Sequence, residues 1–185
     1  MTDRELLHPD VLRKLLRYEP ETGKLFWLRR DREYFETTLA HAVWNKKYPG
    51  KEAFACINKL GYIYGCFFDQ KYLAHRVIWA MQTGAWPKEQ IDHIDRDKSN
   101  NKIENLRESS ISQNGANRTS KPNSSSGYLG VYCDGKTKKW IASIRKGGRR
   151  FHLGRFDCEK DAARAYDTMA ILKHGEFASL NFPSA

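Results

Sequence analysis

A run of small polar residues at positions 119–126 limits how this 185-residue chain can fold. The run holds Thr, Ser, Lys, Pro and Asn but no apolar residue, so it adds nothing to a core and is typical of a linker. It separates two segments, residues 1–118 and 127–185, each suited to one small domain. The sequence therefore predicts two packed modules joined by a polar linker and argues against one large enzyme fold.

The overall charge favours a polyanionic partner. The chain carries 32 Lys and Arg against 22 Asp and Glu, a formal net charge of +10, although a basic surface can also have no partner. A mean hydropathy of −0.73 leaves no room for an apolar membrane span, and no basic amphipathic helix suited to a membrane surface is visible. Residues 1–5 lack the apolar core of a secretory signal, so we expect a cytoplasmic, intracellular protein without a membrane partner.

The last third of the chain shows three strand patterns followed by one helix pattern. Aromatic and β-branched residues predict strands over 130–132, 139–146 and 149–156, and a Gly-Gly turn joins the last two in a tight hairpin. Over 158–174 the apolar residues follow the helical period, with Asp157 as the expected N-cap. We expect this helix to pack on the three-stranded antiparallel sheet.

The longer first segment mixes helix and strand patterns. Residues 9–19 and 73–83 place apolar residues at helical spacing and predict two helices. Residues 24–29 follow a turn and predict a strand, and residues 61–68 alternate like a strand that pairs with its neighbours. Residues 31–51 show only a weak pattern. Both segments together predict the α+β class.

Polar side chains are concentrated between Ile91 and Arg107, at a density that rarely builds a core. Asp92 directly precedes His93, and at a strand end or bulge both side chains can reach the same place. A neutral imidazole, with an ordinary pKa of about 6.5, can take a proton from water while a carboxylate and an amide oxygen hold Mg²⁺ against a phosphate. The segment therefore indicates phosphodiester hydrolysis.

Simpler roles stay open for several residues in this segment. Asp95, Asp97, Ser99 and Asn100 are most simply explained as loop residues that satisfy backbone N–H groups. An EF-hand starting at Asp95 fails because its sixth and twelfth positions lack the required Gly and Glu. Taken alone, His93 would be interpreted as a hydrogen-bonded structural histidine, and only its neighbours favour the catalytic role.

The polar segment resembles the HNH endonuclease motif, more narrowly its phage and intron homing type. The family pattern is a His-Arg pair, then DHIDxDxxNNxxxNL, then a QN-containing helix, and residues 18–27 also resemble a YxPxTGxLxW signature of phage HNH proteins. The likeness covers most of residues 15–118. The matching positions in this chain are His75-Arg76, Asp92 to Leu106 and Gln113-Asn114.

The resemblance implies a ββα-metal fold, with one strand carrying the Asp-His pair, a second strand near residues 106–109 and a helix over about 111–118. It leaves three roles open for His75 and Arg76, which lie on a helix that otherwise looks packed. They are structural, in contact with DNA phosphate, or catalytic.

The resemblance also implies specific roles in the reaction. His93 is the general base, Asp92 and Asn114 are metal ligands, and Asn105 fixes the loop and the backbone of His93. Many HNH enzymes have histidine where this chain has Asn114. The amide oxygen gives an all-oxygen ligand set with phosphate and water, which favours Mg²⁺ or Mn²⁺ over Zn²⁺. The metal would stabilise the leaving 3′ oxygen and yield a 5′-phosphate end.

Residues 127–185 closely resemble the plant Apetala/ethylene-response-factor DNA-binding domain. Such domains also occur fused to phage HNH nucleases, so the two resemblances support each other. The matching positions are Gly130-Val131, Trp140, Ile144-Arg145, Leu153-Gly154, Phe156, residues 162–167 and Leu180 to Pro183.

This second resemblance implies that one face of the sheet packs on the helix while the other enters the major groove of DNA. The packed face is expected to contain Val131, Ile141, Ile144, Leu153 and Phe156. The DNA face is expected to carry Tyr132, Lys139, Trp140, Arg145, Arg149 and Arg150. A core position for Trp140 stays open because alternation near a turn does not settle its side, and a solvated basic hairpin is the simpler alternative.

These observations predict a site-directed DNA endonuclease that acts on double-stranded DNA inside a phage-infected bacterial cell. One HNH site cuts one strand, so a monomer, which we favour over a homodimer, should nick. A restriction or packaging role would use the same chemistry. Two rivals remain: a non-catalytic, sequence-specific DNA-binding regulator and a structural RNA binder.

Overall fold

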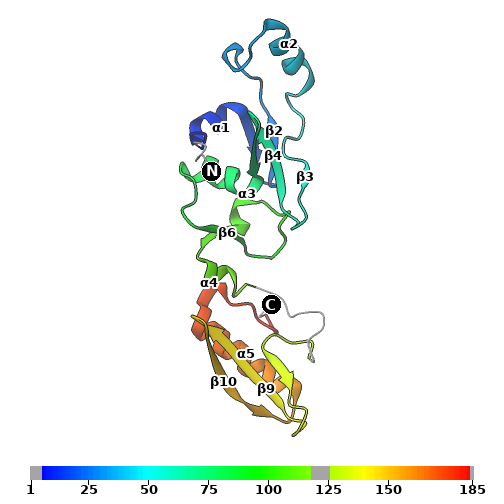
Figure 1. The fold of residues 1–185 in the computed structure, drawn as a ribbon, viewed down its shortest axis with the longest axis vertical. Helices are drawn as coiled ribbons and strands as arrows, with labels where there is room; N and C mark the ends of the chain where they lie inside the picture. Colours follow the sequence, from blue (N-terminus) through cyan, green and yellow to red (C-terminus); the bar gives the residue numbers. More distant parts are fainter. Residues whose placement is uncertain (1–5, 118–125, 184–185) are drawn as a thin grey trace. The chain divides into compact units, whose positions relative to one another are not determined.

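The computed structural model describes residues 6–117 and 126–183 (Figure 1). It confirms the predicted α+β class, since small antiparallel sheets are combined with helices. The chain groups into two compact units, Met1–Glu108 and Ser109–Ala185. Most of the predicted linker lies outside the described residues, and the predicted domain boundary at residue 118 stays a prediction.

The first unit contains three small sheets and three α-helices among its described residues. The sheets pair β1 with β2, β3 and β5 with β4, and β6 with β7. The elements are α1 (Pro9–Leu15), β1 (Leu16–Glu19), β2 (Lys24–Trp27), the 3-10 helix η1 (Arg32–Tyr34), α2 (Thr38–Lys47), β3 (Cys56–Ile57), β4 (Ile63–Phe67), β5 (Gln70–Leu73), α3 (Ala74–Thr83), β6 (Gln90–His93), the 3-10 helix η2 (Ile103–Asn105) and β7 (Leu106–Ser109).

The predicted helix over 9–19 ends four residues early. Leu12 and Leu15 of α1 are fully buried in the core, as the helical spacing predicted. From Leu16 onward the chain pairs with β2, Leu16 opposite Trp27, to form a hairpin. Gly23 closes that hairpin at φ +70°, a conformation that glycine adopts without a side-chain clash. Pairing with the following strand therefore prevails over the helical pattern.

Residues 31–51, where the sequence pattern was weak, contain η1 and α2. Thr37 caps α2 by accepting a hydrogen bond from the Ala40 N–H. Leu39 and Val43 of this helix are exposed. The helix therefore lacks the buried apolar stripe by which a sequence pattern is recognised.

The helix predicted over 73–83 is confirmed as α3. Val77 and Ile78 are fully buried, and α3 ends where Gly84 adopts φ +82° and donates its N–H to the Ala80 carbonyl. The chain then returns as β6, which carries Asp92 and His93 at its end.

The order of strand, loop, strand and helix predicted for the nuclease motif is present. Strand β6 pairs with β7, and α4 (Ile111–Asn114) follows with a capping box in which Ser110 and Gln113 bond each other's backbone N–H groups. The helix is shorter than predicted, and Arg118 lies outside the described residues. Because α4 groups with the second unit, a ββα arrangement around a metal stays a prediction.

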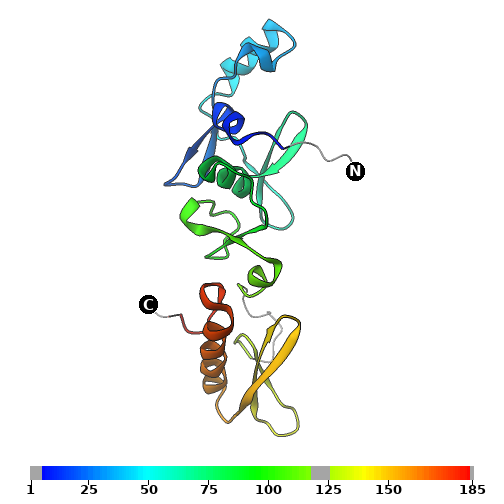
Figure 2. The same ribbon diagram turned by 90° about the vertical axis from the view of Figure 1, so that its left-hand side faces the viewer.

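The second unit is built from a three-stranded antiparallel sheet and one long helix (Figure 2). Its strands are ordered β10-β9-β8, and α5 covers one face, as the sequence predicted. Leu129, Ile144, Tyr166 and Ala170 form part of the core between them. After α4 the elements are β8 (Val131–Cys133), β9 (Trp140–Lys146), β10 (Arg149–Phe156), α5 (Glu159–His174) and the 3-10 helix η3 (Gly175–Phe177).

The N-cap of α5 is Cys158, one residue after the predicted Asp157. The Cys158 side chain makes no capping hydrogen bond. Asp157 instead forms an ion pair with Lys139 at the start of the neighbouring strand, so a contact across the sheet takes the carboxylate that was expected at the helix end.

No helix within residues 6–117 and 126–183 is long and apolar enough to cross a membrane.

Candidate active site and DNA-binding face

Asp92 and His93 lie buried at the end of β6, with 5% and 4% of their surface exposed. Their strand is buried throughout its last three positions because it lies over the core of the first unit. Two adjacent polar side chains at this depth need partners to offset the loss of hydration. The partners found for both residues define the candidate site.

The His93 imidazole lies among other rings and one amide. Its Nε2 is 3.0 Å from Oδ1 of Asn101. The His75 ring stands edge-on to it with a centroid separation of 5.1 Å, and the Tyr62 ring lies 6.0 Å away. The imidazole is therefore held in a packed pocket of the first unit.

Asp92 forms an ion pair with Arg107 of β7. The guanidinium donates from Nε and Nη2 to Oδ2 of the carboxylate, at 3.0 and 2.8 Å. Only 14% of the Arg107 side chain is exposed, so this pair is largely shielded from water. Arg107 was not predicted as a site residue, because its role depends on which strand lies beside the Asp-His strand.

Asn105 fixes the loop that follows His93, as the resemblance implied. Its side-chain Nδ2 donates to the Asn100 carbonyl and to Oδ1 of Asp95, while its Oδ1 accepts from the Asp95 N–H. The Asn105 backbone carbonyl accepts from the Ile94 N–H, next to His93. The position of the loop is thus settled by Asn105, while its part in catalysis stays a prediction.

The acidic residues of the loop are capping residues, the simpler role left open above. Asp95 accepts from the Asp97 N–H, and Asp97 accepts from the N–H and hydroxyl of Ser99. Burial alone would raise the pKa of Asp95, but hydrogen bonds from Asn100, Asn105 and the backbone outweigh it and lower the pKa below its usual value. These carboxylates therefore stay charged while they hold the loop.

His75 and Arg76 occupy structural positions in the first unit. His75 is 4% exposed, and burial, reinforced by the nearby His93 and Arg76, lowers its pKa from 6.5 to about 3. Arg76 donates to the carbonyls of Pro87 and Glu89 in the segment before β6. The geometry favours the structural role over direct DNA contact for both residues.

Asn114 is the predicted second metal ligand, and it lies at the end of α4. That helix belongs to the second unit, so its pairing with Asp92 stays a prediction. Within the described part of the chain, no group of three or more His, Cys, Asp or Glu side chains is arranged to hold a metal ion.

The outer face of the β8-β9-β10 sheet carries a row of exposed basic side chains. Arg145 pairs directly with Arg150, and Tyr132 and Arg155 flank Ile141 on the same face, beyond the row of Ser143 and His152. Tyr132, Arg145 and Arg150 thus lie where the sequence analysis expected them. Arg155 was missed because the β-bulge between His152 and Gly154 shifts the alternation of β10.

Two predicted members of the DNA face lie on the other side. Trp140 packs against the cluster formed by the sheet and α5, which is the core alternative left open above, and Ile141 takes the outer side instead. Arg149 pairs with Lys146, which bonds a carbonyl of α5, so alternation turns both toward the helix side. Lys139, which was also expected on the DNA face, forms an ion pair with Asp157.

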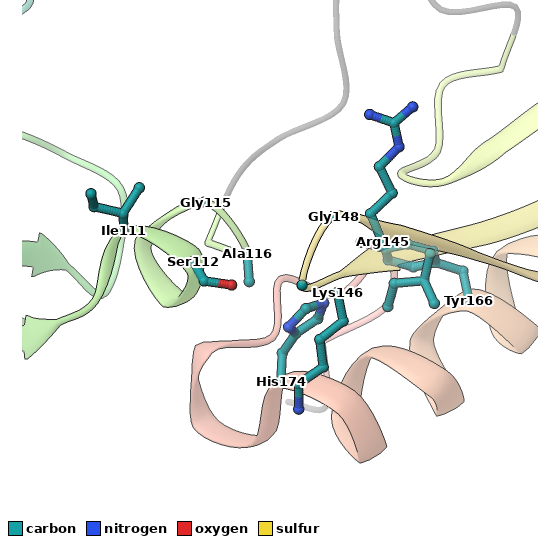
Figure 3. A pocket seen from close by; sticks show the side chains of 11 residues that line it. Ile111, Ser112, Gly115, Ala116, Arg145, Lys146, Gly148, Tyr166 and His174 are labelled. Atoms are coloured by element: carbon teal, nitrogen blue, oxygen red, sulfur yellow. The ribbon is translucent and has the colours of Figure 1, made fainter.

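Figure 3 shows the end of this sheet next to a pocket of about 190 Å³ in the second unit. Arg145 extends away from α5, whereas Tyr166 lies between the sheet and the helix. Lys146 and His174 line the pocket on the helix side. None of the predicted catalytic residues lines this pocket, so we assign it no part in the reaction.

Comparison with known families agrees with both resemblances. Residues 72–116 match the HNH endonuclease family, and residues 126–176 match the AP2 domain family. The chain joins an HNH segment to an AP2 domain. The HNH match includes Asp92, His93, Asn105 and Asn114, and the AP2 match covers the sheet and all of α5.

Individual relatives include proteins named for each of the two families. An uncharacterized HNH endonuclease of Acanthamoeba polyphaga mimivirus is 32% identical over 138 residues, which is 74% of this chain and 66% of that protein. An ethylene-responsive transcription factor of Arabidopsis thaliana is 46% identical over 48 residues, 25% of this chain and 26% of that protein. An APETALA2-like protein of Oryza sativa subsp. indica is 43% identical over 58 residues, 31% of this chain and 13% of that protein. The chain thus spans about a quarter or less of these plant proteins.

Proposed function

We propose that this protein is a metal-dependent, site-directed DNA endonuclease of the homing type. The observation that carries the proposal is the consecutive Asp92 and His93 at the buried end of β6, inside the segment that matches the HNH endonuclease family. The AP2 domain supplies a second DNA-binding surface on the same chain. Hydrolysis of a phosphodiester bond in double-stranded DNA is the function that accounts for both parts.

In this proposal His93 acts as the general base. The imidazole accepts a proton from the attacking water while Asn105 keeps the following loop in place through Asp95 and Asn100. The ring contacts with His75 and Tyr62 hold the imidazole plane and keep bulk water from one side of it. The chain thus provides a fixed base next to a carboxylate.

The available donors fit a hard divalent cation. Asp92 offers a carboxylate and Asn114 an amide oxygen, the ligand types that Mg²⁺ or Mn²⁺ prefers, and the phosphate and water would complete the coordination. When bound, the ion would neutralise charge on the phosphate and on the leaving oxygen. Arg107 shares the Asp92 carboxylate, so it lowers the net charge there and should make the affinity for the ion depend on bound DNA.

The outer sheet face of the AP2 domain binds the duplex in this proposal. Arg145, Arg150 and Arg155 are exposed there, and guanidinium groups pair with guanine edges or with phosphate. Lys136 and Lys138 are better suited to phosphate alone. One HNH site per monomer implies a nick, and we expect the monomer to act in the cytoplasm of a phage-infected bacterial cell.

Relaxation of supercoiled plasmid tests the proposal. We expect the full chain to produce nicked circles in Mg²⁺ or Mn²⁺ and to lose this activity on chelation. Binding to labelled duplex should weaken steeply with salt, with log K falling by about 0.9 per phosphate contacted. An intact plasmid at every metal and enzyme concentration would contradict the nuclease.

A non-catalytic, sequence-specific DNA-binding regulator is the second candidate. The observation in its favour is that Arg107 already engages Asp92, which would leave the HNH segment as a scaffold. This candidate predicts the same duplex binding without metal-dependent strand cleavage. Competition between duplex DNA and folded RNA would separate both candidates from an RNA binder.

A further inference from the structure

The hydrogen bond between His93 and Asn101 decides which ring nitrogen can act as a base. With Oδ1 of Asn101 facing the ring, the Nε2 that lies 3.0 Å from it carries the hydrogen in the neutral ring, because an amide oxygen only accepts hydrogen bonds. The second nitrogen, Nδ1, then holds the lone pair. The contact therefore selects one tautomer of the imidazole and orients it.

Burial of Asn101 at this position destabilises the fold, so its contact with His93 is the role that we consider for it. It is 1% exposed, and its Nδ2 has no hydrogen-bond partner within the described residues. Burying an amide with one group unsatisfied destabilises a fold, whereas Leu has nearly the same shape without that penalty. The bond to His93 is the feature that only a polar side chain provides here.

The N-terminal hairpin holds the backbone of this residue. The Tyr18 hydroxyl accepts from the Ile103 N–H at 2.9 Å and donates to the Asn101 carbonyl at 3.4 Å. Burial raises the pKa of Tyr18, so the hydroxyl keeps its hydrogen. A Cβ on Gly23 would lie 2.7 Å from the Asn101 carbonyl carbon and from the Lys102 nitrogen, so the turn of the hairpin presses directly on this segment.

We propose that Asn101 is a positioning residue for His93, and that the hairpin of residues 16–27 exists in part to hold Asn101 against the imidazole. This inference rests on the proposed function for its catalytic meaning. It gives a role to the YxPxTGxLxW segment, whose purpose the nuclease motif does not explain. Tyr18 bonds the Asn101 carbonyl and the Ile103 N–H, and Gly23 lies against the Asn101–Lys102 peptide bond.

The tautomer of His93 tests the inference without any assay of cleavage. In ¹⁵N-histidine-labelled full chain at alkaline pH, where the ring is neutral, we expect Nε2 to resonate as a protonated nitrogen and Nδ1 as an unprotonated one. Loss of the signals in His93→Gln assigns them. In Asn101→Leu the preference should disappear, and in Asn101→Asp, which keeps an acceptor oxygen, it should return.

The nicking rates of these variants should follow the same order as their tautomer preference. We expect Asn101→Leu to lower the nicking rate about 10- to 100-fold, by analogy with the loss when the partner that orients a metal-ligating histidine is removed. The rate of Asn101→Asp should recover most of that loss, and duplex affinity should stay unchanged in both. Lys102→Ala, a neighbour on the same segment, is the control for general disturbance of the loop.

Two glycines provide a matched pair for the hairpin. Gly23 and Gly50 both have a positive φ, +70° and +81°, so an added Cβ strains the backbone at either. Only Gly23 would strike Asn101, since nothing lies within 4 Å of a Cβ at Gly50. Gly23→Ala should therefore disturb the His93 tautomer and lower the nicking rate tenfold or more, while Gly50→Ala leaves both as in the parent.

Tyr18→Phe keeps the test decisive if Gly23→Ala does not fold. It removes only the hydroxyl and should weaken the tautomer preference. An unchanged His93 tautomer in Asn101→Leu, or equal effects of the two glycine variants, would overturn the inference. A parent that never nicks DNA would remove the proposed function, while the ¹⁵N signals would still decide whether Asn101 and the hairpin position His93.

Discussion

Polar groups of the HNH segment are buried in pairs, whereas those of the AP2 domain stand exposed on one side of a sheet. Asp92 with Arg107 and His93 with Asn101 are each matched to a partner inside the first unit. On the AP2 sheet, Arg145 and Arg150 face solvent side by side, like charge next to like charge.

The two regions differ in where the unfavourable free energy of their polar and charged groups arises. A buried ion or amide loses hydration and must recover it from a fixed partner, so the HNH segment is rigid and sensitive to substitution. Adjacent exposed arginines repel one another and are screened by water and salt, so they add little to the fold and gain their energy only from a polyanion. Substitutions should therefore separate into effects on chemistry and folding in one region and on affinity in the other.

The largest expected effect is that of His93→Ala. Loss of the general base should lower the nicking rate by about 10² to 10⁴, while duplex affinity stays close to that of the parent because the AP2 face is intact. Plasmid relaxation and fluorescence anisotropy of a labelled duplex measure the two quantities. A variant that nicks as fast as the parent would show that His93 is not the base.

Arg107→Leu tests the buried pair through folding. Removing one partner leaves the Asp92 carboxylate buried and uncompensated, and the free energy of unfolding should fall by about 3 kcal/mol. Urea denaturation followed by circular dichroism measures it. Lys24→Ala breaks an exposed ion pair with Glu52 and should leave the denaturation midpoint nearly unchanged, so equal losses in the two variants would break the contrast between buried and exposed charge.

Arg145→Ala and Arg150→Ala sharpen the other side of the comparison. Each should weaken duplex binding by about 1–3 kcal/mol if it pairs with a base, without a change in the urea midpoint. Arg149→Ala is the matched control, since it is an adjacent arginine that alternation turns toward the helix side. Anisotropy titrations that give Arg149→Ala the largest loss would reverse the assignment of the two faces.

The most gradual expected effect is the acid sensitivity contributed by His75. Its folded-state pKa of about 3 lies below the unfolded value of 6.5, so the unfolded chain takes up a proton that the folded chain refuses. The stability from this residue is complete above pH 6.5 and is lost as the pH falls from there toward 3, by at most about 1.4 kcal/mol per pH unit. Urea midpoints at several pH values should fall less steeply in His75→Leu than in the parent.

Much of the local structure was predictable because it depends on neighbouring residues. Helix α3 follows from the helical spacing of its apolar residues, and strand β7 and the loop role of Asn105 were implied by the resemblance to the HNH motif. The misplaced elements are those where a distant partner decides: β1 pairs with β2 instead of extending α1, and the bulge in β10 changes which residues face outward. The weak pattern of α2 reflects its exposed apolar residues.

The residues of the candidate site also fall into two groups, those that the sequence identifies and those that it does not. Asp92, His93, Asn105 and Asn114 are recognisable because their spacing along the chain is short and the family pattern records it. Arg107 and the Tyr18 contact were not recognisable, because their meaning depends on which strand or turn lies beside the Asp-His pair.

By itself the sequence determined the chemical inventory: a polar Asp-His-Asn segment, a basic strand hairpin and a chain that divides between them. Tertiary structure alone decided which groups meet: Arg107 on Asp92, Asn101 on His93, Trp140 against the helix and Arg155 on the outer face. The reason is physical. Side-chain type and spacing are local properties, whereas desolvation, tautomer and sheet face depend on atoms that only folding brings within a few ångströms.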